Sequence, residues 1–260
     1  GMGITGTDVA KDAADVILLD DKFTTIAYAI KEGRRVYRNI QKVIQFLLVG
    51  NIAEILTLFV ATVFNWEAPL LAVHVLWVNL ATATLPALAL GVDPASKNIM
   101  KHPVQSGTLF EASLISRVIT QGIFVAATTI TAYWIGVTIS GHTVGQTMAF
   151  CVLALSQMLR AFNQRSNTEP IWVRSEGMNP WLFVSFGVSA ILMACILFIP
   201  ALQSIFHLTT LTWIQWLIVI GLSVLSIIQV EIVKWISPIL NGDNVIGIVI
   251  VKAVFLIICV

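Results

Sequence analysis

Five polar side chains interrupt the long apolar stretches of this sequence, and each carries an oxygen atom that can bind a metal ion. Asn51 and Glu54 are three residues apart, and Asn79 and Thr82 repeat that spacing, so each pair shares one side of a helix. Gln157 adds an amide from a third stretch. An acid deep in a membrane helix costs at least about 2.5–3.5 kcal/mol and is therefore a functional candidate. Because Ca²⁺ binds about six to eight oxygens, these residues predict an intramembrane cation site.

Pro86 lies four residues after Thr82 and lacks the N–H that would bond to the Thr82 carbonyl oxygen. We therefore expect a kinked or unwound helix there, which membranes tolerate where the backbone lines a cavity or an ion site. The alternative is that these polar groups only hydrogen bond between helices and hold a bundle together. For Gln157 or Thr82 alone that alternative is preferred, whereas Glu54 with Asn51 favours an ion site. His74, alone in an apolar run, is expected to be structural.

The composition of the 260 residues indicates a membrane protein. Hydrophobic residues make up 57% and charged residues 11%, with a net charge of +1, against about 45–50% and about 25% in soluble domains. This excludes an ordinary cytosolic enzyme and a nucleic-acid-binding protein. Six stretches are long and apolar enough to cross a bilayer, at residues 44–64, 69–92, 114–137, 145–163, 181–200 and 213–236. The expected fold is an all-α membrane protein with six transmembrane helices.

Lys and Arg residues alternate between the connections of these stretches. They precede the first span, follow the second, lie between the fourth and fifth and end the sixth. The connections at 65–68, 138–144 and 201–212 contain none. Because positive loops stay in the cytoplasm, we expect the N-terminal segment and the end of the sixth span to be cytoplasmic.

Residues 1–30 are typical of the end of a soluble α/β domain. The run Val16–Leu19 suits a buried strand, and Thr24 or Thr25 could cap the next helix. Thirty residues cannot bury a core of their own, so we expect a longer protein to supply the partners of this segment. From Lys31 to Phe64 no proline interrupts the helical pattern. This predicts one rod of about 51 Å, with a stalk at 31–43, and the alternative is two helices with a bend.

Several motifs resemble type II P-type ATPases, and most closely their calcium pumps. The letters MGITGTDVAK at residues 2–11 and DDKF at 20–23 resemble the end of the family's phosphorylation domain, which is an α/β fold of the haloacid-dehalogenase type. RNIQK at 38–42 and NIAE at 51–54 resemble the stalk and the fifth membrane helix. LWVNLAT at 76–82 and LPALALG at 85–91 resemble the sixth. The resemblance covers about residues 2–236, and the apolar tail at 237–260 stays unassigned.

The resemblance implies an ATP-driven cation pump in the plasma membrane of a bacterium, with these spans as membrane helices five to ten. It implies that Asn51, Glu54, Asn79 and Thr82 bind the transported cation, with Ca²⁺ as the first candidate, and that Gln157 stands at a further ligand position. It also implies that the loop at 93–112 touches the phosphorylation domain. ATP, Mg²⁺ and the phosphorylated aspartate would be bound or carried by the rest of the polypeptide: the actuator, nucleotide and phosphorylation domains and membrane helices one to four. No catalytic or cofactor-binding residue is expected in this chain, which alone should not hydrolyse ATP.

Ala83 departs from the family's pattern, because an aspartate usually follows the threonine of the sixth helix. Loss of an anionic ligand should weaken the binding of divalent cations. Another cation, fewer ions per cycle or a proton on Glu54 therefore stay open. Two other functional classes also stay open: a self-standing six-helix ion channel or secondary transporter, and a pump-derived scaffold that no longer transports.

Overall fold

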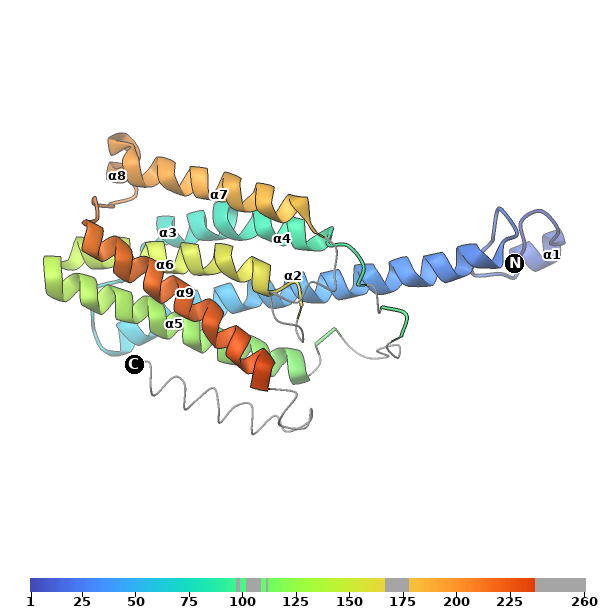
Figure 1. Cartoon of the computed structure of the whole chain (residues 1–260), viewed down its shortest axis with the longest axis horizontal. Coiled ribbons are helices and arrows are strands. Elements are labelled where there is room, and N and C mark those ends of the chain that lie inside the picture. The colour runs from blue at the N-terminus through green and yellow to red at the C-terminus, as the bar shows by residue number, and fades with distance from the viewer. Residues whose placement is uncertain (97–98, 102–108, 111, 167–177, 237–260) are drawn as a thin grey trace.

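The computed structural model describes residues 1–96, 99–101, 109–110, 112–166 and 178–236, and within them it contains helices and no β-strand (Figure 1). The elements are α1 (Asp8–Asp12), α2 (Phe23–Val63), α3 (Ala72–Trp77), the π-helical segment η1 (Val78–Ala83), α4 (Thr84–Gly91), α5 (Ala112–Ser140), α6 (His142–Asn163), α7 (Pro180–Phe198), α8 (Pro200–Ile205) and α9 (Trp213–Ile236). The tail at 237–260 and half of the predicted contact loop at 93–112 lie outside the described residues.

Helix α2 is the longest element and forms one uninterrupted rod. Its 41 residues correspond to about 62 Å at 1.5 Å per residue. Figure 1 shows its N-terminal part extending well beyond the other helices. The predicted rod is confirmed, although it begins at Phe23 rather than near Lys31. The expected stalk and first span are therefore parts of the same helix.

The N-terminal segment differs from two of our expectations. In place of a buried strand at 16–19, a single parallel bridge joins Met2 and Leu18, and Val16 and Leu19 are 70% and 82% exposed. The strand prediction is thus wrong for the described residues. A strand of this kind needs neighbours that cover its apolar side chains, and a segment this short does not supply them.

The predicted helix cap at Thr24 or Thr25 is also wrong, because α2 already begins at Phe23. The N-cap is Lys22, whose side chain makes no capping hydrogen bond, and the residue that holds the turn before the helix is Asp20. Its carboxylate accepts hydrogen bonds from the Lys22 N–H at 3.2 Å and from the Thr25 hydroxyl at 2.6 Å. The Thr25 bond, followed by the Lys22 bond, lowers the pKa of Asp20.

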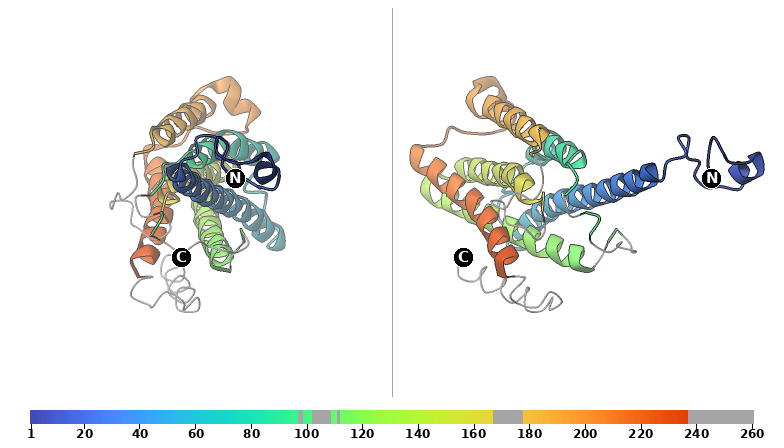
Figure 2. Two further views of the ribbon diagram at one scale, coloured as in Figure 1. Left: turned by 90° about the vertical axis from the view of Figure 1, so that its right-hand side faces the viewer. Right: turned by 45° about the vertical axis from the view of Figure 1, so that its right-hand side comes forward.

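The helices form a bundle in which α6 occupies the interior. Helix α5 packs against α2, α6 and α9, and α4 packs between α2 and α7. The two views in Figure 2 show α7 and α9 on the outside of this arrangement. Helices α2, α5, α7 and α9, together with the composite helix Ala72–Gly91, are long and apolar enough to cross a membrane. These five elements match five of the six predicted spans.

Helix α6 falls on the fourth predicted span, 145–163, but is more polar than the five helices that are apolar enough to cross a membrane by composition alone. Its 22 residues give about 33 Å, which is enough to cross a bilayer core. Sixteen of those residues are buried in the bundle. A helix that is covered by protein needs less apolar surface than one that faces lipid. Its polar content therefore agrees with a central position, and six spans remain our prediction.

Helices α5 and α6 approach each other most closely at a pair of glycines. A Cβ atom added to Gly136 would lie 2.5 Å from the Cα of Gly145, and one added to Gly145 would lie 2.8 Å from the carbonyl oxygen of Tyr133. Small residues at helix contacts allow such close backbone approach in membranes. This contact fixes the position of α6, which carries Gln157.

A buried carboxylate, Asp93, joins three helices where α2 leaves the bundle. Its Oδ2 accepts from Lys42 of α2 at 2.8 Å, and its Oδ1 accepts from the Arg165 Nε just after α6 at 3.0 Å. The Oδ1 atom also accepts from the side chain of Asn179, the cap of α7, at 3.0 Å. Asn39 of α2 donates to the Asp93 carbonyl oxygen at 2.9 Å. These contacts hold α2, α6 and α7 in fixed relative positions at this end.

We predict that Gly136→Val destabilises the bundle by about 1–3 kcal/mol, because the new side chain meets backbone atoms that cannot move aside. The measurement is the thermal unfolding midpoint of the full-length protein in detergent. Gly221→Val on α9 is the matched control, since nothing lies within 4 Å of that position. Equal midpoints for the two variants would contradict the close contact.

We also predict that Asp93→Asn lowers stability by about 3–5 kcal/mol, the usual cost of removing one member of a buried ion pair. The variant removes the charge that Lys42 and Arg165 face. Chemical denaturation of the full-length protein measures the loss. Asp15→Asn, at an exposed position, is the control, and identical unfolding curves for the two variants would exclude a structural role for the Asp93 charge.

Candidate functional site

Glu54 points into the helix bundle. Only 4% of the residue is exposed, and its Oε2 accepts a hydrogen bond of 2.8 Å from the side-chain Nδ2 of Asn79. Helix α2 supplies the acid and η1 supplies the amide. Two of the predicted site residues, 25 positions apart in the sequence, are thus in direct contact.

The helix that carries Asn79 and Thr82 is irregular at these residues. Val78–Ala83 forms a π-helical segment just before Pro86, so the predicted irregularity is present as a widened rather than an unwound helix. The Thr84 hydroxyl donates to the Asn79 carbonyl oxygen at 2.7 Å. From α7, the Ser189 hydroxyl donates to the Ala81 carbonyl oxygen at 2.9 Å. Side chains therefore satisfy backbone oxygens in this segment, and such π-helical turns are frequent at functional sites.

Gln157 reaches the same region from α6. Its side chain packs directly against Gly50 of α2, one helical turn before Glu54. A Cβ atom on Gly50 would lie 2.6 Å from the Gln157 Nε2, so glycine at this position leaves room for the amide. Three helical segments, α2, η1 and α6, therefore bring Glu54, Asn79 and Gln157 together.

The two remaining predicted residues are placed differently. Thr82 is fully buried, and its hydroxyl donates to the Val78 carbonyl oxygen at 2.7 Å, which leaves the lone pairs of its own oxygen as acceptors. Asn51 lies on an exposed part of α2. The structure thus buries four of the five predicted ligands at least partly and leaves Asn51 at the surface of the described bundle.

Several oxygen and nitrogen atoms in this cluster lack a hydrogen-bond partner. The Oε1 of Glu54 and both polar atoms of the Gln157 side chain are buried and unpaired among the described residues. An unpaired polar group in a protein interior is rare and points to a water molecule or an ion. A carboxylate oxygen and an amide oxygen are ligands that hard cations prefer. The cluster therefore has unused capacity to bind a cation.

The charges near the cluster are few. Among the five predicted ligands, Glu54 is the acid. Position 83, where we noted an aspartate in the family's pattern, is an alanine. Arg160 follows Gln157 by one helical turn and is 2% exposed, and its two terminal nitrogens make no hydrogen bond to any described residue. In the described part of the chain, no three His, Cys, Asp or Glu residues gather into a metal centre. Any cation held here would depend on one carboxylate and neutral oxygens.

His74 is structural, as expected from its apolar surroundings. Its ring is fully buried, its Nδ1 accepts from the Leu71 N–H at 3.2 Å, and its Nε2 lies 2.6 Å from the Phe206 carbonyl oxygen.

The sequence did not single out Asp93 or the contact of Gly50 with Gln157. The one signal for Asp93 is its place between the apolar run and Pro94.

Comparisons with known proteins show the family to which this chain belongs. Residues 67–236 match the family model described as cation transporting ATPase, C-terminus. The chain is 42% identical to calcium-transporting ATPase 1 of Bacillus cereus over 90% of its own length and 28% of that protein's. It is 40% identical to the calcium-transporting ATPase of Bacillus subtilis, with coverages of 85% and 25%. It is 31% identical to calcium-transporting ATPase type 2C member 1 of Pongo abelii, with coverages of 90% and 26%.

The chain therefore spans about a quarter of the length of these relatives. The family match covers the helices from α3 to α9, including η1 and α6, whereas α2 with Glu54 lies before the first matched residue. The chain belongs to the cation-transporting ATPase family and corresponds to its C-terminal membrane region.

Proposed function

We propose that this chain forms the cation-binding membrane part of an ATP-driven pump. The observation that supports this most directly is the Glu54 carboxylate, which is buried within the bundle with one oxygen held by Asn79 and the other without a partner. A membrane-embedded carboxylate is expensive and needs a compensating function. Binding of a transported cation supplies that compensation.

In this proposal the cargo is held by oxygens from three segments. Glu54 supplies the negative charge, Asn79 and Gln157 supply amide oxygens, and Thr82 supplies its hydroxyl oxygen. Asn51 completes the set from the exposed side of α2, where it would face membrane helices of the remaining part of the polypeptide. Exposed apolar residues on the same surface, Ile55 at 64% and Leu80 at 65%, are consistent with such a contact.

Calcium is the first cargo to test, because the similar proteins are named calcium-transporting ATPases. The alanine at position 83 leaves the described cluster with one carboxylate. Since ligand charge sets the affinity of calcium sites, we propose a weak site that holds a single divalent ion.

The source of energy in this proposal is ATP, which is bound with Mg²⁺ by the remaining part of the protein. That part would also carry the phosphorylated aspartate, so the 260 residues alone would not hydrolyse ATP. Helix α2 would connect the two parts, because it runs without a break from the N-terminal segment to the level of Glu54. The N-terminal segment and the end of α9 would face the cytoplasm of a bacterium, following the distribution of Lys and Arg.

We predict that Glu54→Gln in the full-length protein abolishes cation-dependent phosphoenzyme formation from ATP, because the neutral amide cannot balance a divalent charge. Phosphoenzyme is measured across a panel of cations. Glu32→Gln, in the part of α2 outside the bundle, where the acid pairs with Arg35 at 2.8 Å, should leave it unchanged. If the Glu54→Gln variant forms as much phosphoenzyme as the wild type, Glu54 is not a ligand. If the wild type forms no phosphoenzyme with any cation, a non-transporting scaffold is favoured.

We also predict that Ala83→Asp raises the affinity for calcium by about tenfold or more, since a second carboxylate would join the cluster. Residue 83 is buried at the end of η1. The measurement is the calcium concentration at half-maximal phosphoenzyme. Ala83→Asn has nearly the same shape without the charge and serves as the control. If the aspartate variant gains nothing over the asparagine variant, the site is built for a different ion.

A further inference from the structure

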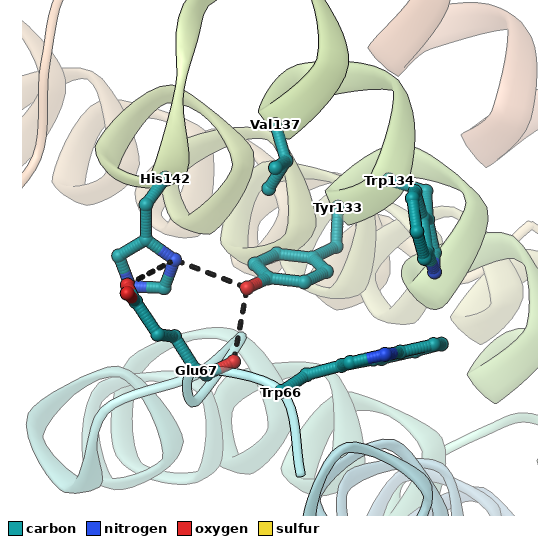
Figure 3. A pocket seen from close by; sticks show the side chains of 6 residues that line it. All are labelled: Trp66, Glu67, Tyr133, Trp134, Val137 and His142. Carbon is teal, nitrogen blue, oxygen red and sulfur yellow. Dashed lines mark hydrogen bonds and ion pairs between the residues drawn. The ribbon is translucent and has the colours of Figure 1, made fainter. Parts of the chain in front are cut away.

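A mostly apolar cavity with a few polar groups lies at the end of the bundle opposite to the projecting part of α2. It measures about 250 Å³ and is lined by Trp66, Glu67, Tyr133, Trp134, Val137 and His142. Figure 3 shows these side chains converging from the α2–α3 connection, the last turns of α5 and the start of α6. None of the proposed cation ligands lines this cavity.

Aromatic rings form much of the wall. Trp66 and Trp134 meet edge to face, with ring centroids 5.1 Å apart and an interplanar angle of 87°. Trp66 also stacks on Phe64 at 5.2 Å, which fixes the orientation of its ring. Tyr133 contributes a third ring, and its hydroxyl donates to the Glu67 carbonyl oxygen at 2.9 Å. The cavity therefore offers several preorganised aromatic surfaces.

The charge of the cavity comes from Glu67 and His142, and the sum of the two is negative or zero. The Glu67 side chain is 74% exposed, and its Oε2 lies 3.1 Å from the Nδ1 of His142. While the imidazole is neutral, this pair keeps one net negative charge. No Lys or Arg is among the described residues that line the cavity. An anionic ligand would thus find repulsion here and a cationic ligand would find attraction.

We propose that this cavity binds an organic ammonium group. Such a group gains from the electron-rich faces of tryptophan and tyrosine within about 6 Å of their centroids and from the Glu67 carboxylate. An inorganic divalent cation fits poorly, because it requires about six to eight oxygen ligands and the side chains of the lining offer only the Glu67 carboxylate and the Tyr133 hydroxyl. The volume is below the range of about 300–1,000 Å³ for drug-sized ligands, which fits a small head group.

Two kinds of ligand could supply the organic ammonium group. Tryptophan and tyrosine are enriched where proteins meet the lipid head groups, so the ammonium of a phosphatidylethanolamine head group is one source. A soluble organic ammonium compound is the other. The proposal does not depend on pumping, and binding is measured without ATP.

The experiment uses the full-length protein in phosphatidylglycerol nanodiscs. Saturation-transfer NMR measures binding of tetramethylammonium, and native mass spectrometry measures retention of added phosphatidylethanolamine. We expect saturable binding of at least one probe. We also expect Glu67→Gln and Trp66→Leu to weaken it about tenfold. Trp213→Leu, at an exposed tryptophan outside the cavity, should bind like the wild type.

The two probes separate the sources, because binding of the lipid alone identifies a lipid site and binding of tetramethylammonium alone identifies a soluble ligand. Trp66→Phe keeps a ring and should retain most of the binding, which controls for misfolding of Trp66→Leu. The proposal is overturned if neither probe binds the wild type saturably. It is equally overturned if Glu67→Gln, at a surface position that folding tolerates, binds like the wild type.

Discussion

A carboxylate inside a lipid bilayer must be compensated, and this requirement explains much of the structure around Glu54. The acid is 4% exposed, so lipid and bulk water cannot solvate it. One oxygen is satisfied by Asn79, and the position of that amide depends on the π-helical segment before Pro86. Gln157 can approach because position 50 is glycine. The bundle thus brings three segments to one acid and leaves part of its hydrogen-bonding capacity unused.

The second structural theme is the continuity of one helix between the bundle and the N-terminal segment. Helix α2 carries Glu54 and continues out of the bundle without a break. Where it leaves, Lys42 and Asn39 contact Asp93, which also contacts Arg165 and Asn179. A movement of the projecting part would therefore be resisted by the ends of α6 and α7 and felt at the level of the acid. The arrangement suits a protein whose energy source and cargo site are far apart.

The sequence predicted the parts of the fold that depend on local pattern. The long rod follows from the absence of a breaker, and the irregular helix follows from the N–H that Pro86 lacks. Contacts between distant residues were out of reach: the partners of Asp93 lie 51, 72 and 86 positions away. The spacing of Asn51 and Glu54 indicated one shared side of the helix, but three residues turn a helix by about 300°. The resulting offset of about 60° places Glu54 inside and Asn51 at the edge.

The account rests on direct contact between the Glu54 carboxylate and the cargo, and equilibrium binding of radiolabelled calcium to the full-length protein without ATP tests this contact. We expect saturable binding to the wild-type protein that is lost in Glu54→Gln while the thermal unfolding midpoint in calcium-free buffer stays similar. Binding of equal affinity and amount to both proteins would show that the buried acid is not a ligand, and would contradict the account.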